Sequence, residues 1–487
     1  MRAIITLLVA IPAMLLSQMV FADGVTLRYD STGNLLHEMH SGDGWTSLWA
    51  ADIGANDESC HLTMAGGQLV CFTADSTLDW QLAVPFDARE VTIGDNGKVY
   101  ITGLGDGDIF RTMGYDADGN QQWNAVWDVV PDNFVDMPTH IRTDTAGNTI
   151  VCGHAAEEGL DTRIALVSYD AAGNARWKRI HTEPEVIYHY AGDMVLDEAG
   201  NIYLAVMKIK NEVYSVDAIK YGANGDLLWD SSYVPDFSDD RLDVNAIALD
   251  ADGNLLIGGS DRNLFVVKFS ASGAYQWNYA HGEGVQGSAQ DIVVDSTGSA
   301  ILAGQWSDGA ISGYLTVMKV EADGSLAWFD QYIGEPDQRL GIAMAIALDD
   351  ADNAFAVGHS CRLKSPPYDV YRKKCEIDTR KYSPEGDLIW MATYKGADGS
   401  STENGHGVRV SGTGDILVTG QYSLEDDDDD PDDDDTAYQD DDNGDDTAFD
   451  DDDNGDDTDD SDDDSGGWMT DDDEDSSSGD DDGNACG

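Results

Sequence analysis

Short stretches of alternating apolar and polar residues follow one another along most of the chain, and turns rich in Gly, Asp and Asn separate them. Residues 264–269 (LFVVKF) are one such stretch, and the run SASG follows them. A period of two is typical of a β-strand with one buried face, and Gly tolerates the positive φ of a tight turn. The hydrophobic pattern therefore predicts an all-β protein made of successive hairpins.

One nine-residue frame recurs through the chain: an aromatic residue, a Gly four positions later and a Trp four positions after that. Residues 269–277 show it best, and copies lie at 115–123, 169–177, 221–229, 320–328 (with Val320 first) and 382–390. Two weaker copies lie at 72–80, where Ser76 replaces the Gly, and at 29–37, where His37 replaces the Trp. Because large rings dominate core energetics, the repeated tryptophans are predicted to form the core of the repeats: Trp80, Trp123, Trp177, Trp229, Trp277, Trp328 and Trp390.

A second hairpin motif alternates with the first. Residues 247–259 show it best, with copies at 141–153, 194–206, 292–304, 346–358 and 408–420 and a looser copy at 91–103. An Asp three residues before the turn Gly, such as Asp250, is expected to accept backbone N–H groups across the turn. Two hairpins in about 50 residues make one four-stranded blade of a β-propeller.

The two ends of the repeat array are complementary. Residues 25–36 form a first-type hairpin that follows no second-type hairpin, and residues 408–420 form a second-type hairpin that no first-type hairpin follows. We expect these strands to pair into one composite blade that closes the ring, which removes exposed sheet edges. The count favours eight blades, and seven remain an alternative if residues 45–80 are an insertion.

Charge and composition divide the chain into three parts. Residues 1–22 read as a secretory signal peptide, with Arg2 before a short apolar run and Ala22 at the predicted cleavage site. Residues 23–424 form the propeller, and residues 425–487 are an Asp-rich tail without Lys or Arg, expected to be disordered. The net charge of −67 argues against nucleic acid as a partner, and no transmembrane segment is evident. We therefore expect a secreted protein at the cell surface or outside the cell, with the periplasm as an alternative.

Six cysteines follow the predicted signal peptide, so disulfides are expected. Cys60 and Cys71 lie opposite each other if residues 65–66 form the turn, and Cys361 and Cys375 bracket a 13-residue insertion. We predict both pairs as disulfides, and Cys152 as a buried thiol in a strand.

The paired motifs resemble a known bacterial family. Residues 292–304 and 316–328, with the recurrent Lys before the aromatic position (Lys220, Lys268, Lys319, Lys381), resemble β-propeller repeats of the SBBP type. The resemblance covers nearly all of residues 25–422, and it implies a secreted or cell-surface bacterial propeller while leaving the activity open.

Three places are candidates for binding chemistry. In the tail, Asp450, Asp452 and Asn454 match the first half of a calcium loop, so weak Ca²⁺ binding is the only cofactor hypothesis. The insertion carries a basic loop that could dock an acidic partner: Arg362, Lys364, Arg372, Lys373 and Lys374. Polar residues that precede inner strands could line a ligand-binding funnel at the ring centre: His140, Asp193, Asn245, Asp291 and His406.

The sequence favours a non-catalytic binding or structural module over an enzyme. The chain has no adjacent Cys pair, haem motif or Gly-x-Ser-x-Gly elbow. We expect a monomer that meets a protein or glycan at the cell surface, with the tail as a spacer. A polysaccharide- or solute-binding propeller is the alternative, and a hydrolase or lyase ranks third, on loop aromatics such as Trp127, Tyr233 and Trp306.

Overall fold

The computed structural model describes residues 22–41, 48–63, 67–130, 135–156, 162–235, 242–282, 286–307, 313–332, 339–363, 373–396 and 402–423. Most of the predicted signal peptide lies outside these residues, as do the tail, with Asp450, Asp452 and Asn454, and the loop residues Lys364 and Arg372.

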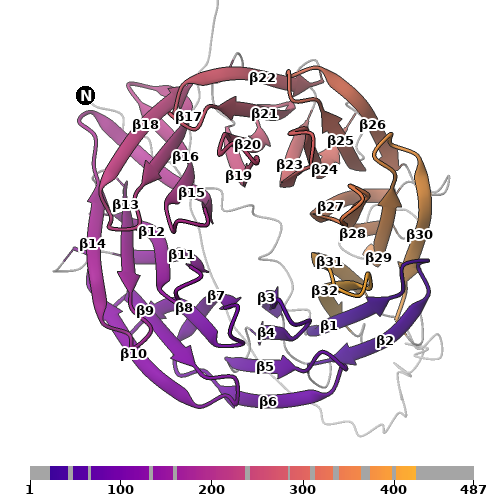
Figure 1. Cartoon of the computed structure of the whole chain (residues 1–487), viewed down its shortest axis with the longest axis horizontal. Coiled ribbons are helices and arrows are strands. Elements are labelled where there is room, and N and C mark those ends of the chain that lie inside the picture. Colours follow the sequence, from indigo (N-terminus) through magenta and orange to yellow (C-terminus); the bar gives the residue numbers. More distant parts are fainter. Residues whose placement is uncertain are drawn as a thin grey trace, which may run out of the picture. The chain divides into compact units, whose positions relative to one another are not determined.

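The described residues form 32 β-strands and no helix, in eight antiparallel four-stranded sheets arranged as blades around a common axis (Figure 1). In a β-propeller this axis is the central channel. The predicted all-β propeller with eight blades is confirmed, and the seven-blade alternative is excluded. Residues 48–83, the most degenerate repeat, form a complete blade, because β3 to β6 pair with one another as in every other blade.

Each blade is named here from its innermost strand outward. Blade 1 contains β3 (Leu48–Ile53), β4 (Ser59–Thr63), β5 (Gln68–Phe72) and β6 (Leu78–Ala83), and blade 2 contains β7 (Asp87–Ile93), β8 (Val99–Gly105), β9 (Ile109–Tyr115) and β10 (Gln121–Trp127). Blade 3 contains β11 (Val135–Thr143), β12 (Thr149–Ala156), β13 (Thr162–Tyr169) and β14 (Ala175–His181), and blade 4 contains β15 (Val186–Leu196), β16 (Ile202–Lys210), β17 (Val213–Tyr221) and β18 (Leu227–Tyr233). Blade 5 contains β19 (Asp243–Leu249), β20 (Leu255–Ser260), β21 (Leu264–Phe269) and β22 (Tyr275–His281), and blade 6 contains β23 (Gly287–Val294), β24 (Ala300–Trp306), β25 (Tyr314–Val320) and β26 (Leu326–Tyr332). Blade 7 contains β27 (Arg339–Leu348), β28 (Ala354–Leu363), β29 (Lys373–Tyr382) and β30 (Leu388–Tyr394), and blade 8 contains β31 (Thr402–Val410), β32 (Ile416–Ser423), β1 (Ala22–Tyr29) and β2 (Leu35–His40).

Blade 8 closes the ring by joining the two ends of the repeat array, as predicted. Strand β1 pairs with β32 in a continuous register from Ala22 opposite Ser423 to Tyr29 opposite Ile416. In Figure 1 the indigo strands β1 and β2 lie beside the yellow strands β31 and β32. Closure thus rests on backbone hydrogen bonds between residues nearly 400 positions apart.

The two motifs of a repeat are joined inside the blade by a buried ion pair. Asp250 accepts the backbone N–H groups of Asp252 and Asn254 across its turn, as expected. Its other carboxylate oxygen lies 2.9 Å from the ammonium of Lys268, the recurrent Lys before the aromatic position. The same pairing joins Lys319 to Asp295 (2.8 Å) and Lys381 to Asp349 (3.4 Å).

The repeated tryptophans join neighbouring blades. The ring of Trp80 packs on the turn Gly119 of the next blade, and its indole N–H donates to the carbonyl oxygen of Ala117 at 2.8 Å. The corresponding bonds elsewhere run from Trp177 to Ala223, Trp229 to Ala271, Trp277 to Ala322, Trp328 to Pro384 and Trp390 to Ser31. Trp123, which is buried, packs on Gly173. Each ring also packs against a hydrophobic cluster, so these residues extend the core across the blade interfaces.

The interface between blades 8 and 1 differs from the others. Here His37 holds the Trp position, and Ser76, with a φ of 68°, holds the Gly position of the facing turn. The two irregular copies of the frame thus meet at one interface. The guanidinium of Arg28 donates instead to the carbonyl oxygen of Ala74, the position that accepts from tryptophan elsewhere.

Both predicted disulfides are present. Cys60 is bonded to Cys71 and Cys361 to Cys375, and in each pair the residues lie directly opposite each other on adjacent strands. Cys152 is a buried free thiol in β12, as predicted, and its burial raises its pKa.

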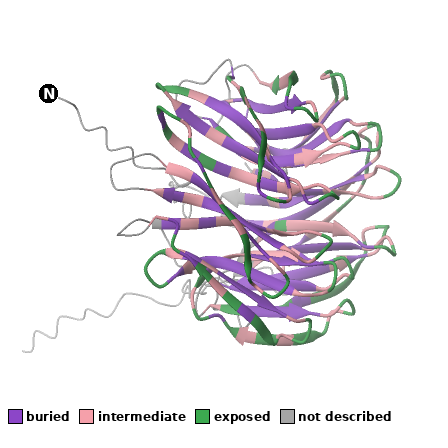
Figure 2. Ribbon diagram, turned by 60° about the vertical axis from the view of Figure 1, so that its left-hand side comes forward, coloured by how far each residue is buried: buried purple, intermediate pink, exposed green. Residues whose placement is uncertain are grey.

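Burial follows the strands, and exposed residues gather at turns and along outer strands (Figure 2). Within the described residues, no helix has the length and apolarity that crossing a membrane requires.

A charged cavity in the wall of the central channel

Every innermost strand carries a β-bulge at the same place, and the predicted funnel residues lie at it. The register shifts before His140 in β11, Asp193 in β15 and Asp291 in β23. Asn245 in β19 and His406 in β31 are themselves the extra residues. Bulges re-aim side chains, so the five predicted residues occupy one level of the ring.

Arg142 joins two of the inner strands through carboxylates. Its guanidinium lies 2.6 Å from Glu90 of β7 and 3.0 Å from Asp193 of β15. Burial alone would lower the pKa of Arg142, but the charges of Glu90 and Asp193 raise it by more, so the net pKa is above the ordinary value. This side chain therefore stays charged. The Arg side chain is 35% exposed and Glu90 19%, so the network faces the channel without being fully buried.

Carboxylates also accept hydrogen bonds from the inner edges of neighbouring blades. The inner edge of an innermost strand has no neighbouring strand, so its N–H groups need other acceptors. Glu90 accepts from Ile141 N at 3.0 Å, Asp52 from Ile93 N at 2.8 Å, and Asp291 from Ile346 N at 2.8 Å. Burial raises the pKa of Glu90 and Asp52, and that of Asp291 to about 6.

Two further predicted funnel residues, His140 and Asn245, bond across blade interfaces too. His140 Nε2 lies 3.1 Å from the carbonyl oxygen of Ala191. The amide of Asn245 donates to Ala289 O at 2.9 Å and to Ser288 Oγ at 3.1 Å. Burial lowers the pKa of His406. His140 and Asn245 are thus links between blades. Nδ1 of His140 also lies 3.7 Å from Glu90, so both His140 and Asp193 join the Arg142 network.

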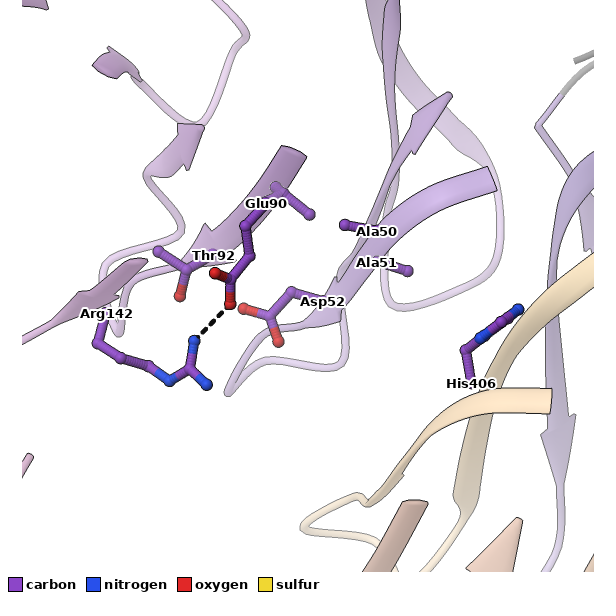
Figure 3. A pocket seen from close by; sticks show the side chains of 8 residues that line it. Ala50, Ala51, Asp52, Glu90, Thr92, Arg142 and His406 are labelled. Carbon is purple, nitrogen blue, oxygen red and sulfur yellow. Dashed lines mark hydrogen bonds and ion pairs between the residues drawn. The ribbon is translucent and has the colours of Figure 1, made fainter. Parts of the chain in front are cut away.

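A cavity of about 540 Å³ opens at this network (Figure 3). The carboxylates of Asp52 and Glu90 point toward the same space from adjacent strands, with Arg142 paired to Glu90 and His406 across from them. Its lining comes from β3, β7, β11 and β31: Ala50, Ala51, Asp52, Glu90, Val91, Thr92, Arg142 and His406. The volume lies within the range of small-molecule sites.

Part of the channel wall on the inner strands of blades 4 to 7 is apolar, although Asp193, Asn245 and Asp291 lie on the same strands. An open groove there, of about 460 Å³, is lined by Val195, Leu196, Ile247, Ala248, Leu249, Ile292, Val293, Val294 and Leu348. These residues belong to β15, β19, β23 and β27, which occupy a different part of the inner ring in Figure 1 from β3, β7, β11 and β31. The inner wall therefore has a charged arc and an apolar arc.

The sequence analysis missed three residues of the charged arc: Asp52, Glu90 and Arg142. Glu90 immediately precedes the looser motif copy at Val91, as Asp193 precedes Met194 and Asp291 precedes Ile292. A strict alignment of the repeats would have included it. Arg142 shares its motif position with Arg409 of the copy at 408–420, whereas Asp52 has no acidic counterpart in the other copies.

A second polar cluster lies in blade 4, where Glu183, Asp217 and Asp230 offer oxygen atoms close enough together for a metal ion. The ammonium of Lys208 already lies 3.0 Å from Glu183 and 2.5 Å from Asp217. Burial would lower the pKa of Lys208, but these carboxylates raise it. The lysine thus supplies the positive charge that a metal would bring.

The remaining candidates are only partly described. Arg362 and Lys374 face each other across β28 and β29, next to the disulfide, and Lys373 lies on β29, but the rest of the basic loop is outside the described residues. The three aromatics expected in loops end strands instead: Trp127 in β10, Tyr233 in β18 and Trp306 in β24. Trp127 is buried with Phe110 against its ring, and Tyr233 and Trp306 are half-buried, so that expectation is wrong.

Known proteins resemble this chain in fold. Solved structures with similar folds include Sqt1 of Saccharomyces cerevisiae (8% identity, 77% of this chain and 95% of that chain, TM-score 0.47) and virginiamycin B lyase of Staphylococcus aureus (10%, 81% and 98%, 0.39). The Dos1 propeller is similar too (10%, 82% and 81%, 0.45). No curated protein matches significantly.

One family model matches part of the chain. Residues 22–218 match the model described as outer membrane protein assembly factor BamB. The match begins in β1 and ends in β17, so it spans the first half of the repeat array. The chain is thus an eight-bladed β-propeller whose residues 22–218 are similar to BamB-like repeats.

Proposed function

We propose that this protein is a non-catalytic, secreted or surface-exposed propeller that binds a small solute at the charged cavity of its channel. The observation that carries this proposal is the cavity lined by Asp52, Glu90, Arg142 and His406, together with an apolar groove on the inner strands of blades 4 to 7. Such convergence of a few polar groups in a concave site is typical of ligand binding. The signal-like N-terminus and two disulfides support export, and the SBBP-type resemblance supports a bacterial cell-surface setting.

A solute fits this cavity better than a polysaccharide. Among the described residues that line it there is no Trp, Tyr or Phe on which a sugar ring could stack. The tail then serves as a spacer, because its like charges repel and extend it.

Thermal unfolding of the full-length protein with a panel of solutes and glycans tests the proposal. A ligand of the native state raises the midpoint, and Ala51→Trp, which fills the cavity, should abolish that rise. Ala172→Trp, in an exposed turn of blade 3, is the matched control and should keep it. A panel without any effect, or a midpoint rise that survives in Ala51→Trp, would refute the channel as the binding site.

A further inference from the structure

The charge balance of the cavity wall indicates whether the cavity accepts a cation or an anion. Asp52, Glu90 and Asp193 contribute three carboxylates, whereas Arg142 contributes one guanidinium to this network. Arg142 is engaged by Glu90 and Asp193 on two sides. Its charge is therefore already balanced, and a negative ligand would face a surplus of carboxylates.

The carboxylates at the cavity lack full compensation. The two oxygens of Asp52 each accept one backbone N–H, from Ile53 and Ile93, both at 2.8 Å. Among the described residues no cation forms an ion pair with Asp52, and the nearby charge of Arg142 and a hydrogen bond with Thr92 lower its pKa by less than burial raises it. Its carboxylate therefore keeps a lone pair for another donor. Burial raises the pKa of both Asp52 and Glu90 even with Arg142 nearby, so an additional positive charge in the cavity would favour their charged forms.

A bare metal ion does not suit this wall. Within the described part of the chain, the acidic cluster with metal-like spacing lies in blade 4, away from the cavity residues, and Lys208 neutralises it. The cavity of about 540 Å³ is also far larger than one ion, and Ala50, Ala51 and Val91 form an apolar part of its lining. A ligand with both a positive group and an apolar body matches this combination.

We infer that the cavity binds an organic ammonium compound, with its positive group against Asp52 and Glu90 and its apolar body along Ala50, Ala51 and Val91. This inference rests on the proposed function, since it names the ligand class of the same site. The neighbouring apolar arc, from Val195 to Leu348, offers more surface to longer compounds.

Linear alkylammonium ions from butyl to octyl, titrated calorimetrically into the full-length protein, test the inference. The matched alcohols and carboxylates serve as neutral and anionic probes. We expect measurable binding of the ammonium series alone, with affinity rising by up to about fourfold per added methylene group. Glu90→Gln and Asp52→Asn should each weaken it by about tenfold, whereas Asp118→Asn, in an exposed turn between β9 and β10, should not.

The outcomes separate this inference from the proposed function. If an alcohol or a carboxylate binds and Ala51→Trp blocks it, the channel binds solutes but the ammonium assignment is overturned. If ammonium ions bind equally to wild type, Glu90→Gln and Asp52→Asn, they associate with the acidic surface, and the assignment is again overturned. If no probe binds and the wider panel also has no effect, both fail. Should Glu90→Gln not fold, Asp52→Asn and the chain-length series still decide.

Discussion

The guanidinium of Arg28 donates a hydrogen bond to the carbonyl oxygen of Ala74, and so replaces the tryptophan contact at the interface between blades 8 and 1. Arg28 also bonds to Asp415 through Nε (3.0 Å) and Nη2 (2.7 Å). This interface therefore depends on charged hydrogen bonds where the others depend on an aromatic ring and a glycine.

Substitution Arg28→Met should weaken ring closure. Hydrogen bonds to charged groups contribute about 1.5–3 kcal/mol, and the side chain is only 15% exposed. We expect the free energy of unfolding in urea to fall by about 2 kcal/mol. Lys395→Ala, at an ion pair where the Lys is 53% exposed, should change it by less than about 0.5 kcal/mol. Equal effects of the two variants would contradict a special role for Arg28.

Substitution Gly119→Ala should disrupt the contact between blades 1 and 2. Gly119 has a φ of 80°, and an added Cβ would lie 2.6 Å from Cδ2 of Trp80. Gly414→Ala is the matched control, because Gly414 has a φ of 83° and open space around it. Both variants incur about 1–2 kcal/mol for the left-handed backbone. Gly119→Ala should lose about 1–3 kcal/mol more, from the steric clash, as measured by chemical unfolding.

Substitution Lys268→Met should be strongly destabilising, because it leaves the carboxylate of Asp250 buried without its partner. Both side chains are 5% exposed. Breaking such a pair costs about 3–5 kcal/mol. The double variant Lys268→Met with Asp250→Asn removes the unpaired charge and should recover part of the loss. Thermal unfolding of the three proteins checks this, and a double variant no more stable than Lys268→Met would contradict it.

Stability should fall on acidification partly through His61. This ring is fully buried, and Nε2 lies 2.6 Å from Thr26 Oγ1. Burial, with a smaller effect from His40, lowers its pKa to about 4. The unfolded chain, with a pKa near 6.5, then binds more protons between pH 6.5 and 4, so this contribution is complete above pH 6.5 and is lost as the pH falls.

The difference in unfolding free energy between wild type and His61→Gln measures that contribution. It should shrink by about 2–3 kcal/mol from pH 7.5 to pH 4.5. A difference that is independent of pH would mean that His61 does not titrate as its burial requires.

Reduction should destabilise blade 7 through Cys361–Cys375. This bond closes the base of the inserted loop, and such a closure contributes about 3 kcal/mol in the chain-entropy model. The variant Cys361→Ala with Cys375→Ala should unfold at a lower temperature and respond less to dithiothreitol than wild type. Cys152→Ala, at the free thiol, should retain the full response to dithiothreitol. A double variant as sensitive as wild type would exclude this disulfide as a stabilising link.

The sequence alone was sufficient for the propeller fold and favoured eight blades, but only the structure showed that residues 48–83 form a blade and not an insertion. A period of two, turn glycines and a repeated Trp are local signals, and eight copies of them define eight blades. Ring closure followed from the unmatched hairpins at 25–36 and 408–420, and the disulfides followed from opposite positions on hairpin strands. These features were predictable because each depends on residues close in sequence, or on the repetition of such residues.

Only the tertiary structure showed which side chains come together to form the site. Asp52, Glu90 and Arg142 come from three different blades, and no local pattern says that their side chains share one cavity. Likewise, His37 and Ser76 read as two independent irregularities in the sequence, yet they face each other at one interface. The physical reason is that a propeller brings its inner strands together around a common axis, so side-chain contacts there depend on ring closure rather than on spacing along the chain.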